Sequence, residues 1–174
     1  LQWDFNIGNI LCAVAVLVSQ KIEVPMIQDI VAKFQSVAGR LEEVPNLRWA
    51  KIFVDYAHTE DSLRNVLETL KQIEWIHRVI TVFWATWDRD KTKRPKMGRV
   101  ADILSDVIIL TDDDTYTEDS IAIIRDVTNG ITRKEGEKFW IIPSREDAIR
   151  TALIMLREWD VLIVAGKWAE TVQV

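Results

Sequence analysis

Two helical patterns open the chain. Residues 9–20 are almost continuously apolar, and residues 24–37 place apolar side chains on one face of a helix. The pattern breaks at Gly39-Arg40. We therefore expect helices in residues 1–38 and a separate domain in residues 39–174.

After residue 39 the pattern alternates between β-branched runs and amphipathic helices. Five runs predict strands, at Lys51–Tyr56, Arg78–Phe83, Asp106–Thr111, Phe139–Ile142 and Val161–Ala165. Helices are expected between them, capped by Thr59, beginning at Pro95, capped by Thr117, and capped by Ser144. Leu41–Val44 is expected to form a hairpin with the first of these strands. This recurrence is typical of βαβ units and predicts an α/β fold: a Rossmann-like, mainly parallel sheet with helices on both faces, preceded by a short helical segment.

Composition and charge narrow the function classes. The 174 residues carry a net charge of −5 without a Lys/Arg cluster, so a nucleic-acid partner is not expected. The longest apolar run, Ile10–Val18, is shorter than the roughly 18–20 residues that cross a bilayer, so no membrane partner is expected either. The single cysteine, Cys12, cannot form an internal disulfide and fits a cytoplasmic protein.

Four polar segments directly follow predicted strands. They are residues 55–59, 88–94, 111–116 and 166–170. Ligands of open α/β sheets bind outside the carboxyl ends of the strands, where these segments meet. The sequence therefore predicts a binding site at this edge of the sheet.

Each segment also has a structural interpretation. Residues 88–94 hold two acids and four bases, which fits a clamp for a charged substrate with Arg89 facing a carboxylate, or a loop of self-paired ions. Asp112-Asp113-Asp114 fits acceptance of an ammonium group or metal ion, or complementation of the following helix dipole. His58, at a strand end near Asp55, fits either a functional role or a purely structural one. Gly166-Lys167 is not a phosphate loop, because the earlier glycine and the following Ser or Thr are missing.

Six ordered segments resemble the Mur ligase family, most closely its UDP-N-acetylmuramyl-tripeptide synthetases. They are Phe5–Asn9, Gly39–Glu42, Asp55–Ser62, Asp88–Gly98, Thr111–Asp113 and Gly166–Glu170. The family forms an amide bond: ATP, with Mg, phosphorylates the carboxylate of a UDP-muramyl peptide, and the amine of an amino acid attacks the acyl phosphate. The resemblance implies that residues 1–38 are the terminal helices of the central ATPase domain and that residues 39–174 are the C-terminal ligase domain.

The resemblance also implies roles for individual residues. The nucleotide-binding residues would be Asn6 and Asn9 near the adenine, Arg40 near the nucleotide, Asp55 at the ribose, and His58 close by. The residues that bind the incoming amino acid would be Arg89, Asp113, Asp114, Tyr116, Gly166 and Glu170.

The chain departs from the family pattern in three ways. The phosphate loop and magnesium ligands of the central domain are absent, so we expect the chain to be part of a longer enzyme, with no catalytic residue, metal site, bound cofactor or ligation activity of its own. Family members that add diaminopimelate carry Asp-Asn-Pro-Arg where this chain has residues 113–116, and Ala169 replaces a histidine. Diaminopimelate is therefore doubtful, and Asp114 suits a cationic side chain such as that of lysine.

The third departure concerns tryptophan. The chain has eight tryptophans and only six glycines, about half the average glycine usage of roughly 7%. Trp3, Trp84, Trp87 and Trp168 stand where the family has glycine, and Trp159 falls at a turn that usually contains one. Such parallel replacement points to engineering or to a sequence wrongly assigned to a natural protein, and we predict glycine at these positions in the unsubstituted parent. The alternative function is a non-catalytic or engineered scaffold or binding module on this fold.

Overall fold

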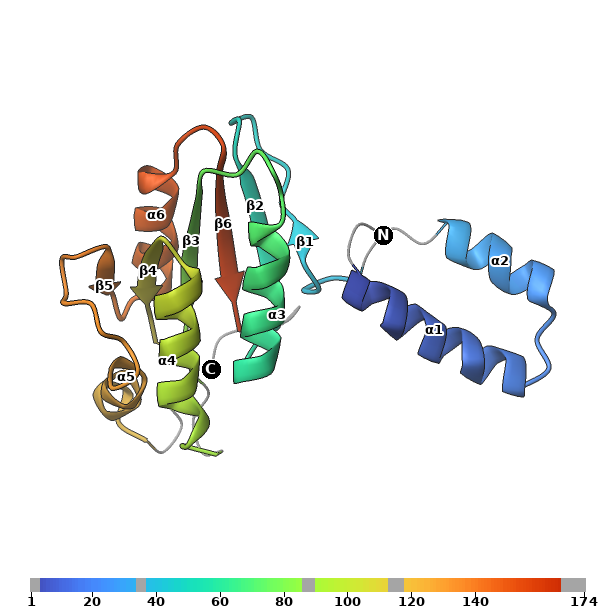
Figure 1. Ribbon diagram of the computed structural model, residues 1–174, viewed down its shortest axis with the longest axis horizontal. Coiled ribbons are helices and arrows are strands. Elements are labelled where there is room, and N and C mark those ends of the chain that lie inside the picture. The colour runs from blue at the N-terminus through green and yellow to red at the C-terminus, as the bar shows by residue number, and fades with distance from the viewer. Residues whose placement is uncertain (1–3, 34–36, 86–89, 113–117, 167–174) are drawn as a thin grey trace. The chain divides into compact units, whose positions relative to one another are not determined.

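The computed structural model describes residues 4–33, 37–85, 90–112 and 118–166, and it divides into two compact units, Leu1–Val37 and Ala38–Val174 (Figure 1). The first unit contains α1 (Asp4–Ser19) and α2 (Val24–Lys33). Lys21 follows the end of α1 in the left-handed conformation, with φ 60°, and the amide of Ile22 donates to the carbonyl of Leu17. No helix in the described ranges is long and apolar enough to cross a membrane.

The second unit is built on one sheet, in which the described residues form six strands. They are β1 (Glu42–Glu43), β2 (Lys51–Asp55), β3 (Arg78–Phe83), β4 (Val107–Leu110), β5 (Phe139–Ile141) and β6 (Asp160–Ala165), in the order β1-β2-β6-β3-β4-β5. The pairs from β2 to β5 are parallel, and β1 pairs antiparallel with β2 through Glu42 and Val54. The mainly parallel sheet and the hairpin are as predicted.

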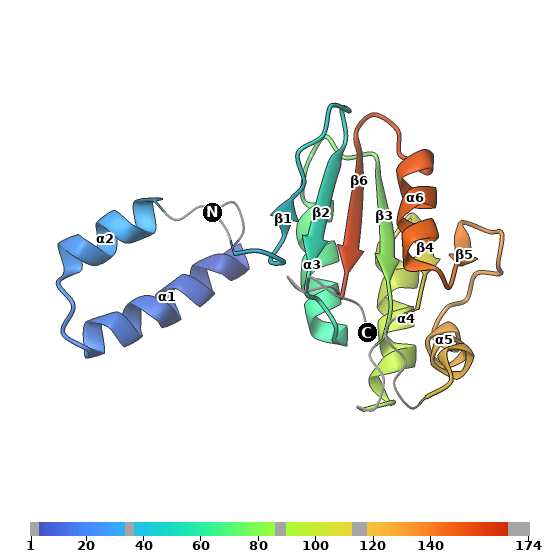
Figure 2. The same ribbon diagram turned by 180° about the vertical axis from the view of Figure 1, so that it is seen from behind.

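Helices cover both faces of this sheet. They are α3 (Glu60–Lys71), α4 (Lys93–Leu104), α5 (Ser120–Thr128) and α6 (Arg145–Met155). Figures 1 and 2 show α3 and α4 on one face and α6 on the other. The α6 face buries side chains of alternate strand positions, such as Ile80, Val82 and Leu162, against Ala148 and Ala152. The opposite face buries apolar side chains of α3 and α4, among them Leu63, Leu67, Leu70 and Met97.

The strand order creates a switch point. The chain moves outward from β3 through β4 to β5, and then returns by way of α6 to place β6 between β2 and β3. Right-handed crossovers put α6 on the face opposite to α3 and α4, because the direction of travel reverses. The carboxyl ends of β2, β6 and β3 are therefore the place where a ligand crevice is expected.

Two predicted helix starts are wrong. Pro95 is the third residue of α4, not the first, which is tolerated because the first helical N–H groups have no intrahelical acceptor. Asp119, not Thr117, caps α5: its Oδ1 accepts from the amide of Ile121 at 3.0 Å. Thr117 itself lies outside the described residues.

Candidate functional site

Asp55 ends β2 and is buried at the switch point. Its side chain is 4% exposed. Its Oδ2 accepts from the amide of Leu41 at 2.7 Å, and its Oδ1 accepts from the amide of Ala57 at 2.8 Å. Burial raises the pKa of Asp55, while these two amides and the charge of Arg40 act in the opposite direction. The carboxylate is thus engaged by the backbone on both oxygens.

Arg40 lies in a turn beside this carboxylate. The residues before and after it, Gly39 and Leu41, have φ angles of 69° and 43°. The amide of Gly39 donates to Oε2 of Glu42 at 2.8 Å, and its carbonyl accepts from the amide of Tyr56 at 2.8 Å. The turn therefore holds Arg40, which is exposed, above the end of β2.

Arg40, Tyr56 and His58 form a short column of planar groups. The Arg40 guanidinium carbon lies 5.2 Å from the centroid of the Tyr56 ring, and the Tyr56 and His58 ring centroids are 4.5 Å apart. Nδ1 of His58 is 2.9 Å from the carbonyl oxygen of Tyr56, which fixes the ring. A cation and two half-buried rings of this kind offer charge and flat surface to a nucleotide.

The neighbouring strands bring Gly166 and Trp84 to the same edge. The amide of Gly166 donates to the carbonyl of Asp55 at 2.9 Å, which joins the ends of β6 and β2. Gly166 has φ 98°, and a Cβ at this position would lie 3.0 Å from Cε2 of Trp84. Trp84 is 1% exposed, and its indole Nε1 has no hydrogen-bond partner among the described residues. Arg145 covers its ring with the guanidinium 4.0 Å from the centroid.

The described part of the charged loop, residues 90–94, is largely engaged by the protein. Asp90 accepts from the amide and hydroxyl of Thr92 at 2.9 and 2.6 Å, and these hydrogen bonds lower its pKa. Lys91 pairs with Glu118 at 2.9 Å, and Lys93 donates to the carbonyl of His58 at 3.0 Å. These bases therefore bind groups outside residues 88–94, and the clamp hypothesis depends on Arg89.

Several predicted site residues lie outside the described residues. They are Arg89, Asp113, Asp114, Tyr116 and Glu170, together with Ala169 and the tryptophans Trp3, Trp87 and Trp168. Asn6 and Asn9 belong to α1 in the first unit; Asn9 is exposed, and the side chain of Asn6 is not described. Of the predicted residues, the structure brings together Arg40, Asp55, His58 and Gly166.

The described residues do not contain a group of three or more potential metal ligands, so we assign no magnesium site to them.

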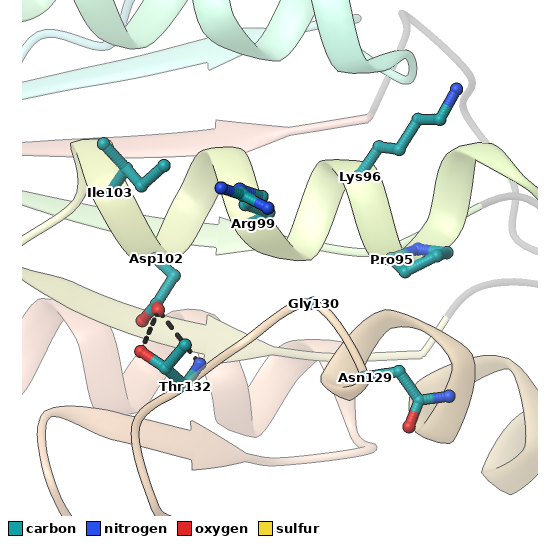
Figure 3. Close-up of a pocket in the computed structure, with 8 residues that line it drawn as sticks. All are labelled: Pro95, Lys96, Arg99, Asp102, Ile103, Asn129, Gly130 and Thr132. Atoms are coloured by element: carbon teal, nitrogen blue, oxygen red, sulfur yellow. Dashed lines mark hydrogen bonds between the residues drawn. The ribbon is translucent and has the colours of Figure 1, made fainter.

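A groove of about 550 Å³ lies away from the carboxyl ends of β2 and β6, between α4 and residues 129–132 (Figure 3). Asp102 in this groove accepts from the amide of Thr132 at 2.9 Å. A Cβ on Gly130 would lie 1.8 Å from the carbonyl oxygen of Pro95, so glycine is needed for this close packing. The groove contains none of the predicted site residues.

Three features were not predicted. Tyr56 was part of a motif but had no role, although its place between Asp55 and His58 at a strand end was a usable signal. The stacking of Arg145 on Trp84 joins residues far apart in sequence and left no sequence signal. The same is true of the buried Arg94, which pairs with Glu118 and Asp126.

Comparison with known proteins identifies the family. Residues 39–168 match the model of the Mur ligase glutamate ligase domain. The chain is 39% identical over 170 residues to the UDP-N-acetylmuramoyl-L-alanyl-D-glutamate–2,6-diaminopimelate ligase of Clostridioides difficile (strain 630), with 98% of this chain and 35% of that protein covered. It is 41% identical over 174 residues to the ligase of the same name from Geobacillus kaustophilus (strain HTA426), with 100% of this chain and 35% of that protein covered.

A solved structure of a ligase with that name agrees in fold. It superposes with a TM-score of 0.72 at 32% identity, with 99% of this chain and 35% of that chain covered. The chain thus spans about a third of the length of the curated relatives it matches. The ordered motifs, the fold and these matches agree, and the chain belongs to the Mur ligase family.

Proposed function

We propose that this chain supplies the nucleotide- and amino-acid-binding side of an ATP-dependent ligase that adds an amino acid to a UDP-muramyl peptide. The observation that carries the proposal is the column of Arg40, Tyr56 and His58 above the buried Asp55, at the switch point of a Mur ligase domain. The names of the relatives support an amide-forming reaction on peptidoglycan precursors.

In the nucleotide half of the site, Arg40 would face the phosphates. An arginine presents several N–H donors in one plane, which suits phosphate oxygens, and here the guanidinium lies over the Tyr56 ring. Asp55 and His58 would lie at the ribose side, with Asn6 and Asn9 near the adenine. The residues present fit a nucleotide, and ATP with Mg is the cofactor that this assignment requires.

In the amino-acid half, Arg89 would pair with the carboxylate of the incoming amino acid. Asp113, Asp114, Tyr116, Gly166 and Glu170 would contact the remainder of it. The relatives are named for 2,6-diaminopimelate. Tyr116 cannot form the ion pair that an arginine makes with a distal carboxylate, and Asp114 favours an ammonium group. We therefore propose a substrate with a cationic side chain, such as lysine.

The proposed reaction uses the nucleotide and the amino acid in two successive steps. The γ-phosphoryl group of ATP moves to the carboxylate of the muramyl peptide, which forms an acyl phosphate and ADP. The amine of the amino acid then attacks the acyl carbon, a proton is lost, and phosphate leaves. The residues of this chain would hold the charged ends of both reactants, and such positioning and charge stabilisation supply most of the rate in phosphoryl chemistry. A reaction that uses ATP and a UDP-linked precursor supports a cytoplasmic location.

The rival function is a non-catalytic scaffold or binding module, and ligand binding separates the two. The missing phosphate loop predicts that this chain alone holds no ATP, whereas the column of Arg40, Tyr56 and His58 predicts binding that calorimetry detects. Arg40→Gln should then weaken ATP binding about tenfold, because a hydrogen bond to a charged group contributes about 1.5–3 kcal/mol. Arg150→Gln is the control, since Arg150 lies on α6 in an exposed pair with Glu146. Failure of the folded chain to bind either ATP or any amino acid would favour the scaffold.

A further inference from the structure

The turn that carries Arg40 has an unusual backbone. Arg40 stands between two residues in the left-handed region, Gly39 at φ 69° and Leu41 at φ 43°. Glycine adopts this conformation without cost, whereas a branched, buried residue such as Leu41 disfavours it. Something in the surrounding structure must hold Leu41 there.

Asp55 is the group in contact with this strained residue. Its Oδ2 accepts from the amide of Leu41 at 2.7 Å, a contact between residues fourteen positions apart in sequence. Its Oδ1 accepts from the amide of Ala57 at 2.8 Å. One carboxylate thus ties the turn that carries Arg40 to the loop that carries Tyr56 and His58.

Two further hydrogen bonds hold the same turn. The amide of Gly39 donates to Oε2 of Glu42, and the carbonyl of Gly39 accepts from the amide of Tyr56, both at 2.8 Å. They fix the start of the turn, whereas Asp55 fixes the residue directly after Arg40. Arg40 itself then reaches the Tyr56 ring at 5.2 Å.

We propose that Asp55 is a positioning residue for Arg40: by accepting from the Leu41 amide it holds the left-handed turn that places the Arg40 guanidinium over Tyr56, ready to face the phosphates of a nucleotide. This inference rests on the proposed nucleotide site, and it gives Asp55 a second role, which acts through Arg40, beside its place at the ribose. An aspartate is needed because both of its oxygens accept. In asparagine one of them becomes an NH₂ donor, which would face a backbone N–H.

The first experiment uses the ligand-free chain. In NMR spectra the Nε–H signal of Arg40 should show a ring-current shift from Tyr56, and Tyr56→Leu defines its position without the ring. We expect Asp55→Asn to move the signal most of the way to that position. Asp61→Asn, at an exposed aspartate in the first turn of α3, is the matched control and should leave it unchanged. Glu42→Ala releases the Gly39 amide from the same turn, and it should move the signal even if Asp55→Asn fails to fold.

The second experiment compares ATP with 2′,3′-dideoxy-ATP. Because 2′,3′-dideoxy-ATP has no ribose hydroxyl, a positioning role predicts that Asp55→Asn still weakens binding of this analogue, and that it weakens that binding no further when Arg40→Gln is already present. A loss seen with ATP alone, and not with the dideoxy nucleotide, would mean that Asp55 acts only through the ribose and would overturn the proposal. So would an unshifted Arg40 signal in folded Asp55→Asn and Glu42→Ala. If the wild-type chain binds no ATP, the proposed nucleotide site fails, and the Arg40 signal alone decides whether Asp55 holds the turn.

Discussion

Arg94 and Glu118 form a two-point ion pair, with Nη1 3.1 Å from Oε2 and Nη2 2.9 Å from Oε1. Arg94 lies in the first turn of α4 and is 1% exposed, and Asp126 of α5 accepts from Nη1 at 2.9 Å. The pair fastens α4 to the start of α5. We expect Arg94→Gln to lower the free energy of unfolding by about 3 kcal/mol, because it removes the buried guanidinium that Glu118 and Asp126 share, while Glu118 keeps its ion pair to Lys91. Urea unfolding followed by circular dichroism measures this.

The control for Arg94 is Arg150→Gln on α6. Arg150 pairs with Glu146 at 2.6 Å, but the two side chains are 66% and 80% exposed. Exposed pairs of this kind contribute less than about 0.5 kcal/mol. Equal losses in the two variants would show that the Arg94 pair is no more important than a surface pair.

Asp55 should make stability depend on pH in an unusual direction. Burial raises its pKa above the ordinary value of 3.8. At pH values between 3.8 and the raised pKa of folded Asp55, the folded chain binds more protons at Asp55 than the unfolded chain does. The stability that this extra proton binding contributes is therefore lost as pH rises. The free energy of unfolding of the wild type, minus that of Asp55→Asn, should therefore fall as pH increases upward from about 3.8. Urea unfolding across that range tests it, and a difference that grows with pH would be the opposite result.

Trp159 lies in a conformation that suits glycine. It has φ 66° and is 39% exposed, and its ring centroid lies 5.9 Å from those of both Trp49 and Trp75. Trp75 is 40% exposed and is not among the residues with positive φ. Relief of backbone strain should make Trp159→Gly at least about 1 kcal/mol less destabilising than Trp75→Gly, although Trp159 has more ring contacts. Thermal unfolding of the two variants gives the comparison, and a larger loss for Trp159→Gly would contradict it.

Trp84 and Trp159 also bear on the natural residue at these positions. Trp84 is buried against Gly166 with an indole N–H that lacks a partner in the described residues, and Trp159 has a glycine-like backbone. Tryptophan stands at several unrelated sites where the family has glycine. A single codon would produce this pattern if the source cell reads it as glycine while the genetic code used to translate the sequence reads it as tryptophan. We expect peptide mass spectrometry of the protein from its source to find glycine at both positions. Tryptophan in those peptides would refute this.

Local patterns predicted the fold well because strand and helix periodicity are local properties. Arg78–Phe83 was predicted with its observed bounds, and Ser144 caps α6 as expected, accepting from the amide of Asp147. The edge that gathers Asp55 and Gly166 followed from parallel topology alone. The family resemblance, not the local pattern, suggested Arg40.

The contacts that give these residues their surroundings were not predictable in this way. Asp55 was expected at a ribose, but the sequence gives no sign that Leu41 would take a left-handed conformation and donate to it. The partner of Arg94 lies 24 positions away, and its choice depends on how α4 and α5 pack. Such contacts are set by tertiary geometry, which periodicity does not encode.

The most direct test of the proposed function is amino-acid-dependent ADP release by a chimera. In it, this chain replaces the matching third of the Clostridioides difficile ligase, and Arg89→Gln in the same chimera is the control. We predict ADP release that depends on an added amino acid, is strongest with one that has a cationic side chain, and falls at least tenfold in the control, as expected for a lost charge-assisted contact of about 1.5–3 kcal/mol. A folded chimera that binds ATP and the muramyl peptide, yet releases no more ADP with any amino acid than without, would contradict the proposal.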